Sequence, residues 1–247
     1  MDKTILITGG SRGIGAATAL LAAQKGYQVC INYWKSKDAA LKIVDCINQQ
    51  GGKSAAFQAD VSSETQVIAL FEAVDRLGSL SALVNNVGIL EKQMRVEEMA
   101  AERLQRIFNH NILSCFLCTK EAIKRMSTRY GGMGGAIVNV SSIAARTGAP
   151  GEYVDYATSK GAMDTFTLGV AKEVAAEGIR VNGVRPAFIY TDIHASGGEP
   201  GRVDRIKDTI PMKRGGKVEE VAQAILWLLS EEASYCTGTF IDISGGK

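Results

Sequence analysis

Short apolar runs alternate with longer segments of helical periodicity along the whole chain. The apolar runs, which predict strands, fall near residues 4–8, 28–33, 54–59, 82–85, 136–141, 180–184 and 240–243. In most of the intervening segments the apolar positions recur three or four residues apart, which predicts helices. Successive right-handed crossovers from strand to helix to strand then give a parallel sheet that is covered on both faces. The pattern therefore predicts an α/β fold with a seven-stranded parallel sheet and helices on both faces.

The alternation continues to the end of the chain without a linker, a repeat or a low-complexity tail. At 247 residues the length alone would allow two domains, yet single domains of this size are common. Apolar residues make up 46% of the chain, which is enough for a large core. We therefore predict a single domain over residues 1–247.

The first predicted strand leads into a glycine-rich turn and then a helix, in the sequence KTILITGGSRGIGAATALLAAQKG. Gly9, Gly13 and Gly15 form a G-x-x-x-G-x-G pattern, which allows a tight turn, close approach to a pyrophosphate and close packing of helix on strand. The helix N-terminus adds free amide donors and the positive end of the helix dipole. A glycine-rich turn alone also closes ordinary loops. Together with the predicted sheet, it indicates a doubly wound Rossmann fold that binds a dinucleotide.

Tyr156 and Lys160 are four residues apart in a predicted helix that follows the strand-like segment AIVNVSS, which ends at Ser142. Residues at this spacing share one face of a helix, so the lysine would lie beside the phenol and lower its pKa. Tyr153 lacks this neighbour, because the residue four positions on is Ala157. Taken alone, the pair is more typical of an ordinary helix surface. In a dinucleotide-binding fold it indicates proton transfer to or from a carbonyl oxygen.

These motifs together resemble the short-chain dehydrogenase/reductase family over nearly the whole chain. The matching segments are TGGSRGIG at 8–15, Asp60-Val61, NNVG at 85–88, Asn111, Ser142, YATSK at 156–160, RPAFIYT at 185–191 and the closing TGTFIDISGG. Within the family the chain looks most like bacterial glucose 1-dehydrogenases and 3-oxoacyl-(acyl-carrier-protein) reductases. Two positions depart from the usual pattern: Val87 stands in place of Ala, and Ala187 follows Pro186 in place of Gly.

The resemblance implies an enzyme that interconverts a secondary alcohol and a ketone by hydride transfer to or from a nicotinamide cofactor. Its implied catalytic residues are Asn111, Ser142, Tyr156 and Lys160. Its implied cofactor-binding residues are Gly9, Ser11, Arg12, Gly13, Ile14, Gly15, Asn32, Lys35, Ser36, Asp60, Val61, Asn86, Gly88, Tyr156, Lys160, Pro186, Ile189 and Thr191.

Each catalytic residue has an expected role. Ser142 would hydrogen-bond the substrate oxygen, with Ser141 as the competing choice at the same strand end. Tyr156 would give or take the proton, and Lys160 would hold the nicotinamide ribose and keep the pKa of Tyr156 low. Asn111 would support a water relay behind the lysine.

Charge at the end of the second strand favours NADP, with NAD possible as a secondary cofactor. An NAD site commonly carries an acidic residue there for the ribose hydroxyls, whereas this chain has NYWKS at 32–36. Arg12, Lys35 and Ser36 would then surround a 2′-phosphate. The alternative is that Arg12 and Lys35 are ordinary solvated charges. Asp38 is expected in the first turn of a helix rather than at the ribose.

A segment at 192–216 is rich in Gly, Pro and charged residues, with a short helix expected near 203–207. We interpret it as a mobile substrate lid. We expect a small carbonyl or alcohol compound as substrate, for example a sugar or a 3-oxoacyl compound, and the polar lid slightly favours a hydroxylated one.

Composition and charge give no reason to expect a nucleic acid, a membrane or a metal ion as a partner. A net charge of +2 with scattered Lys and Arg gives no reason to expect nucleic acid. No apolar stretch is long enough to span a bilayer, and no signal-type segment precedes the first strand, so we expect a cytoplasmic protein without a membrane partner. Five cysteines suit a reducing compartment, and Cys115 and Cys118 fit helix packing better than metal binding. We expect no metal site.

The resemblance also implies a homotetramer, for which helices near 100–126 and 152–176 would supply the interface. A second class of function is a dinucleotide-binding regulator without catalysis. A sugar-nucleotide epimerase or dehydratase is a further option, but such relatives usually carry a longer C-terminal substrate domain.

Overall fold

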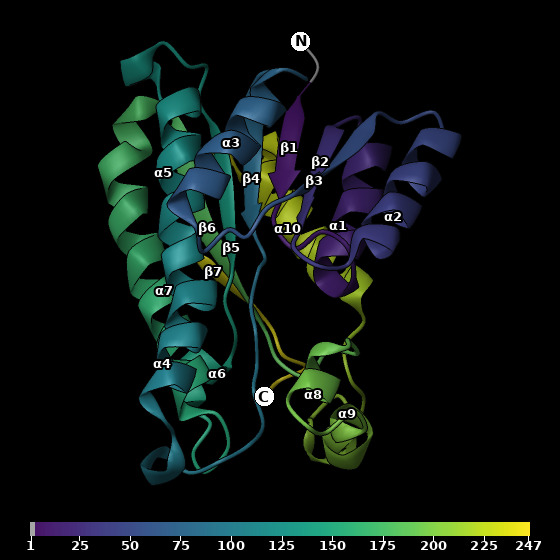
Figure 1. Cartoon of the computed structure of the whole chain (residues 1–247), viewed down its shortest axis with the longest axis vertical. Helices are drawn as coiled ribbons and strands as arrows, with labels where there is room; N and C mark the ends of the chain where they lie inside the picture. The colour runs from purple at the N-terminus through teal and green to yellow at the C-terminus, as the bar shows by residue number, and fades with distance from the viewer. Residues whose placement is uncertain (1–2) are drawn as a thin grey trace.

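The computed structural model describes residues 3–247, and its centre is a seven-stranded parallel sheet with the strand order β3-β2-β1-β4-β5-β6-β7 (Figure 1). The strands are β1 Thr4–Ile7, β2 Gln28–Tyr33, β3 Ser54–Gln58, β4 Leu80–Asn85, β5 Gly135–Val140, β6 Ile179–Pro186 and β7 Phe240–Ile243. The predicted fold class is thereby confirmed. Met1 and Asp2, which the single-domain prediction includes, lie outside the described residues.

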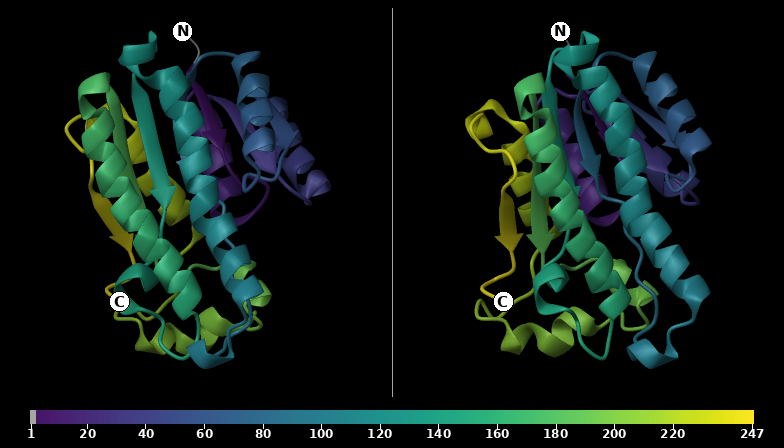
Figure 2. Two further views of the ribbon diagram at one scale, coloured as in Figure 1. Left: turned by 60° about the vertical axis from the view of Figure 1, so that its left-hand side comes forward. Right: turned by 90° about the vertical axis from the view of Figure 1, so that its left-hand side faces the viewer.

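Helices cover both faces of the sheet (Figures 1 and 2). The α-helices are α1 Gly13–Gln24, α2 Lys37–Gln49, α3 Glu64–Asp75, α4 Ala101–Phe108, α5 Ser114–Met126, α6 Ala144–Thr147, α7 Val154–Val174, α8 Ile193–Ser196, α9 Arg202–Ile206 and α10 Val218–Leu229. Short 3-10 turns lie at Val96–Glu98, Thr128–Tyr130, Ala175–Glu177, Lys207–Thr209 and Glu231–Ala233.

Alternate residues of the strands supply two separate cores. Ile5 and Ile7 of β1 belong to the core under α1, α2 and α10, whereas Leu6 belongs to the core under α3, α5 and α7. This division arises because successive side chains of a strand point to opposite faces of the sheet. It explains why the strands of a sheet covered on both faces are continuous apolar runs.

The main difference from the predicted elements is in the helix expected at 100–126. A π-helical turn at Asn109–Leu113 joins α4 to α5, so the helix is continuous but widened at Asn111. Such turns insert one extra residue into a helix and are frequent at functional sites. The helix expected near 203–207 is α9, which begins one residue earlier.

The segment expected to form the lid contains α8 and α9, and both lie below the carboxyl ends of the strands (Figure 1). It is joined to the sheet by β6 before it and by α10 after it. The fold therefore places this segment where a doubly wound sheet binds its ligand.

A buried polar chain crosses the sheet beneath α5 and α7. Asn85 of β4 donates to Asn139 of β5 at 2.8 Å and to Thr119 of α5 at 2.9 Å. Asn139 donates in turn to Thr167 of α7 at 2.8 Å and accepts a weak bond from Cys115 at 3.5 Å. Burial raises the pKa of Cys115 to about 12, and that thiol and the one of Cys118 pack inside the helix layer as predicted.

We expect Asn139→Ala to lower the free energy of unfolding by about 2–4 kcal/mol, because it leaves the buried groups of Asn85 and Thr167 without their partner. Urea unfolding followed by circular dichroism measures this loss. The exposed Gln49 of α2 provides the control, since Gln49→Ala should change stability by less than about 0.5 kcal/mol. Equal effects of the two substitutions would contradict the role of the polar chain.

Candidate functional site

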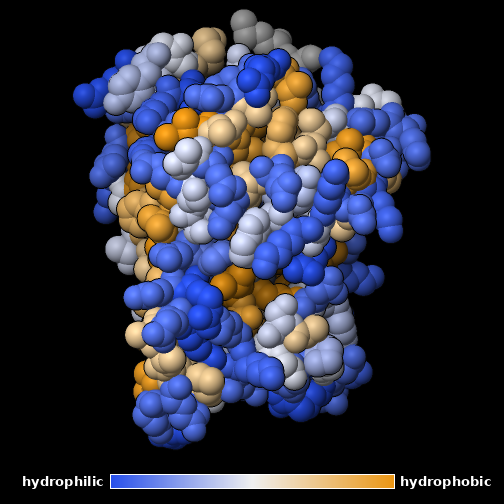
Figure 3. All heavy atoms as spheres, in the orientation of Figure 1, coloured by the Kyte–Doolittle hydropathy of each residue, from blue (hydrophilic) through white to orange (hydrophobic). Residues whose placement is uncertain are grey.

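A cavity of about 690 Å³ opens at the carboxyl ends of the strands, between the body of the molecule and the lid segment. All predicted site residues except Gly15 and Asn111 line it, and these two contact residues of its wall. In Figure 3 apolar atoms are visible in a recess at the lower centre, surrounded by polar surface. The fold thus brings together residues from position 9 to position 191 of the sequence.

The glycine turn has the shape that a pyrophosphate requires. Gly9 and Gly13 have positive φ angles of 62° and 56°, which favour glycine. A Cβ atom on Gly15 would lie 2.5 Å from the carbonyl oxygen of Gly9 and 2.6 Å from the amide nitrogen of Asn86, so a side chain has no room there. Helix α1 begins at Gly13, and its first amides have no acceptor within the helix. The turn therefore fits a dinucleotide.

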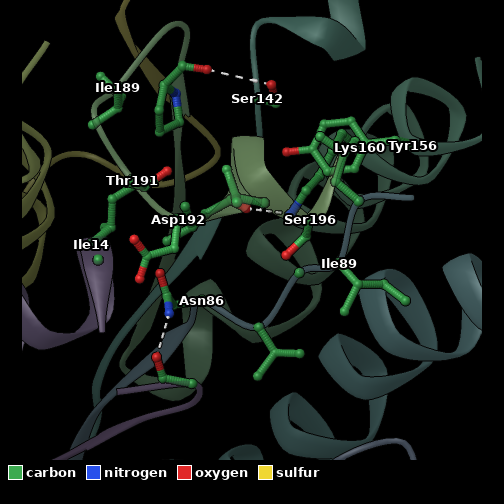
Figure 4. A pocket seen from close by; sticks show the side chains of 18 of the residues that line it. Ile14, Asn86, Ile89, Ser142, Tyr156, Lys160, Ile189, Thr191, Asp192 and Ser196 are labelled. Carbon is green, nitrogen blue, oxygen red and sulfur yellow. Dashed lines mark hydrogen bonds between the residues drawn. The ribbon is translucent and has the colours of Figure 1, made fainter. Parts of the chain in front are cut away.

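Two asparagine side chains fix this turn against the neighbouring strands. Asn86 donates to the carbonyl oxygens of Thr8 at 2.9 Å and Gly9 at 3.1 Å (Figure 4). Asn32 is buried, donates to the carbonyl of Ala59 at 2.9 Å and accepts from the amide of Gly9 at 3.4 Å. The amide of Asn32, predicted to bind cofactor, is thus largely occupied in holding the turn.

The cations predicted for a 2′-phosphate lie at the cavity wall. Arg12 and Lys35 are both exposed there, and Lys35 Nζ lies 4.0 Å from the centre of the Trp34 ring. The Trp34 ring lies 5.5 Å from the ring of His110, and both rings line the cavity. Helix α2 begins directly after Ser36, so its N-terminus lies beside these cations.

Tyr156, Lys160 and Ser142 meet deep in the cavity (Figure 4). The hydroxyl groups of Tyr156 and Ser142 point into the same space, and Lys160 Nζ donates to the carbonyl of Val140 at 2.7 Å. Ser141 donates instead to the carbonyl of Lys160 at 3.3 Å, away from that space. Of the two serines proposed from the sequence, Ser142 therefore faces the phenol.

The pKa of Tyr156 differs from the expectation. Burial raises the pKa of the phenol to about 12, and only the contact with Ser142 opposes this. Burial likewise lowers the pKa of Lys160 to about 8, against the smaller opposing effects of Cys115 and Asp164. Lys160 Nζ lies 5.7 Å from the centre of the Tyr156 ring. The expected lowering of the phenol pKa is therefore wrong for the chain alone, because burial of the phenol outweighs the one opposing contact, that with Ser142.

Asn111 lies in the π-helical turn, where its side chain faces the loop after β4. Its Oδ1 accepts from the amide of Ile89 at 2.7 Å, and its Nδ2 donates to the carbonyl of Ile89 and to Ser159, both at 3.1 Å. Both amide hydrogens are therefore used. The side chain ties the loop after β4 to α7, and the predicted water relay stays a prediction.

The two departures from the family pattern leave the cavity intact. The Val87 side chain packs against the core under α3, α5 and α7, and its amide donates to Thr8 Oγ1 at 3.2 Å. Pro186 is buried, and the amide of Ala187 donates to Ile243 at 3.0 Å. Neither side chain displaces Ser142, Tyr156 or Lys160.

The end of the cavity beside α8 and α9, which we call the lid end, contains a buried arginine. No pattern in the sequence indicated this residue. Arg202 of α9 bonds Glu152 and Glu199 and lies 5.2 Å from the centre of the Tyr153 ring. Hydrogen bonds from Arg205 and Arg202 lower the pKa of Glu199 to about 2, so this carboxylate is charged at neutral pH. The charge of Arg202 is therefore already compensated.

Other residues that line this end were not named individually from the sequence. They are Leu90, Ile143, Glu152, Tyr153, Phe188, His194 and Arg202. Ile143 and Glu152 bound a segment expected to carry substrate specificity, and His194 and Arg202 lie in the segment interpreted as the lid, whereas Leu90, Tyr153 and Phe188 had no such signal. His194 makes the ordinary polar contact expected of it, to the carbonyl of Ile189 at 2.9 Å.

Comparison with known proteins indicates an oxidoreductase, which agrees with the geometry of the site. A family model described as enoyl-(acyl carrier protein) reductase matches residues 9–247. The chain is 62% identical to the uncharacterised oxidoreductase YgfF of Escherichia coli (strain K12), over 98% of both chains. It is 37% identical to glucose 1-dehydrogenase 2 of Bacillus subtilis (strain 168), over 99% of this chain and 94% of that one.

Among solved structures, the 3-ketoacyl-(acyl-carrier-protein) reductase of Brucella melitensis complexed with NADH superimposes with a TM-score of 0.91. The two chains are 31% identical, and the match covers 99% of this chain and 97% of that one. The chain therefore belongs to the short-chain dehydrogenase/reductase family of oxidoreductases. It is an enzyme with a small-molecule substrate and a nicotinamide dinucleotide cofactor.

Within residues 3–247, no helix combines the length and the apolar character needed to cross a membrane.

Burial of Lys160 predicts a pH dependence of stability. The native state binds the lysine proton with a pKa of about 8, below the ordinary value of 10.5 in the unfolded chain. Between these values the unfolded state holds more protons, so the free energy of unfolding rises with pH. We expect a gain of about 2–3 kcal/mol between pH 7 and pH 10, relative to Lys160→Met. Denaturant unfolding of both proteins across this range measures it, and a constant difference would contradict the burial of a charged lysine.

Proposed function

We propose that the protein is an NADP-dependent oxidoreductase that interconverts a secondary alcohol and a ketone, with Tyr156 as the general acid and base. The observation that carries this proposal is the meeting of Tyr156, Ser142 and Lys160 in the cavity that also contains the glycine turn. A phenol and a hydroxyl facing one space provide two hydrogen bonds to a single carbonyl oxygen.

The protonation state of Tyr156 supports carbonyl reduction as the direction that the chain favours by itself. A phenol with a pKa of about 12 is protonated at neutral pH and can donate to the oxygen on which charge develops. Lys160, with a pKa of about 8, can then pass a proton toward the tyrosine. In the opposite direction Tyr156 must first lose its proton, which burial disfavours.

The cofactor supplies the hydride, and in its oxidised form it adds a positive ring that favours the phenolate. Ser11, Gly13 and Ile14 would hold the pyrophosphate, and Lys160 the nicotinamide ribose. The exposed charges of Arg12 in the glycine turn and Lys35 after β2 support NADP over NAD, since no carboxylate stands at the end of β2.

The lid end of the cavity supports a 3-oxoacyl or related apolar ketone more than a sugar. Leu90, Ile143, Tyr153 and Phe188 line it, and the charge of Arg202 is compensated by two carboxylates. A sugar would leave several hydroxyl groups against apolar walls, which is costly. The slight preference for a hydroxylated substrate, inferred from the polar lid sequence, thus loses support.

A dinucleotide-binding regulator without catalysis is the alternative. The complete set of Asn111, Ser142, Tyr156 and Lys160 argues against it.

The cytoplasmic location, the homotetramer and the lid bounds of 192–216 stay predictions. Exposed Leu113 at the end of the π-helical turn, Phe116 on α5 and Leu168 on α7 support an interface on these helices.

Tyr156→Phe should lower kcat for NADPH-dependent ketone reduction by at least about 100-fold, because it removes the proton donor and little else. Loss of NADPH absorbance, measured with a panel of ketones, 3-oxoacyl thioesters and sugars, tests this and ranks the substrate classes. Tyr130, exposed and outside the cavity, gives the matched control Tyr130→Phe, which should keep wild-type turnover. Near-normal turnover of Tyr156→Phe would show that the assignment is wrong.

Arg12→Ala should reduce the preference for NADP over NAD by about tenfold, since an arginine bond to a phosphate contributes about 1.5–3 kcal/mol. Dissociation constants of NADPH and NADH from fluorescence titration measure the ratio. The exposed Arg76 lies outside the cavity, so Arg76→Ala should leave the ratio unchanged. Tighter binding of NADH than NADPH by the wild-type protein would overturn the proposed cofactor preference.

A further inference from the structure

An ion pair between Arg103 of α4 and Asp155 of α7 is buried beside the proposed catalytic tyrosine. The Nε atom of Arg103 lies 2.7 Å from Oδ2 of Asp155, and its Nη2 lies 3.3 Å from Oδ1. Both residues are at most 4% exposed. Taking two charges out of water is costly, so a buried pair has to be held by further hydrogen bonds.

Those further bonds lead to the active-site segments. Asp155 Oδ1 also accepts the backbone amide of Tyr156 at 2.9 Å. Arg103 Nη1 donates to the carbonyl of Lys92 at 2.6 Å, in the loop after β4. Arg103 therefore connects two segments. One is the first turn of α7, and the other is the loop after β4 that contains Ile89 and Leu90 of the cavity wall.

The bonds of Asn111 form a matching tie one turn further along α7. Ser159 Oγ donates to the carbonyl of Tyr156 at 2.7 Å and accepts from Asn111 Nδ2 at 3.1 Å. The backbone amide of Tyr156 is thus held through Asp155 and Arg103, and its carbonyl through Ser159 and Asn111. Both ties begin on the continuous helix formed by α4 and the π-helical turn, which packs against α7 (Figure 2).

We propose that Arg103 and Asp155 are positioning residues, which fix the backbone of Tyr156 so that its phenol meets the substrate oxygen. This inference rests on the proposed function of Tyr156. The pair contacts neither the phenol nor Ser142, so it acts through the direction in which α7 presents the side chain. A displacement of about 1 Å at a reacting group can cost about 100-fold in rate.

Three variants separate positioning from stability. Arg103→Met leaves a buried, unpaired carboxylate and should lower kcat by about tenfold or more. In Arg103→Met combined with Asp155→Asn, the neutral amide oxygen still accepts the Tyr156 amide, so kcat should return to within about threefold of wild type. In Arg103→Met combined with Asp155→Ala this acceptor is lost, and kcat should stay low. The dissociation constant of NADPH should be the same in all three.

Arg125→Met provides the matched control. Arg125, on α5, pairs with Asp75 and Glu121 at 2.8 Å each, far from the cavity lining. It should lower the melting temperature but keep kcat per folded molecule. The inference is overturned if the Asn and Ala double variants have the same kcat, or if kcat follows melting temperature across all variants including Arg125→Met.

Hydrogen exchange tests the pair without relying on turnover. Peptides covering residues 90–95 and 153–158 should exchange at least about fivefold faster in Arg103→Met and unchanged in Arg125→Met. If wild-type protein reduces no member of the ketone panel, the proposed function fails, while the exchange result still decides whether Arg103 fixes these segments. Unchanged exchange in Arg103→Met would overturn the inference by itself.

Discussion

Hydrogen bonds from asparagine side chains hold the cavity in shape. Where the strands end, the backbone leaves the sheet and loses its ladder partners, yet its buried groups still require bonds. An asparagine amide offers two donors and an acceptor, enough to join two such segments. Asn32 and Asn86 do this at the glycine turn, and Asn111 does it between the loop after β4 and α7. The shape of the glycine turn depends on the first two, and the backbone of Tyr156 is held in part through the third, by way of Ser159.

Features that are local in the sequence could be predicted, and features that depend on distant contacts could not. The strands followed from apolar runs, the glycine turn from residues that tolerate positive φ, and the Tyr156–Lys160 face from a spacing of four. The π-helical turn at Asn111 has no sequence signature that separates it from an ordinary helix. Arg103 and Asp155 are 52 residues apart, and each alone is typical of a helix surface.

The electrostatics of the site also needed the structure. Spacing placed a cation beside a phenol, which predicts a lowered phenol pKa. The spacing carries no information on burial. Burial favours the neutral form of both the phenol and the lysine amine. As a result the pKa of Tyr156 rises to about 12 and that of Lys160 falls to about 8. A neutral phenol that faces Ser142 is a hydrogen-bond donor for an oxygen, which is the state needed at the start of a carbonyl reduction.

The two ends of the cavity differ in charge. At the glycine turn and the end of β2, Arg12 and Lys35 are exposed cations without a carboxylate partner among the described contacts. At the lid end, Arg202 is buried against Glu152 and Glu199. A charged substrate group would have to break this pair, whereas an uncharged one would only contact apolar walls. The same cavity therefore suits an anionic dinucleotide at one end and a neutral carbonyl compound at the other.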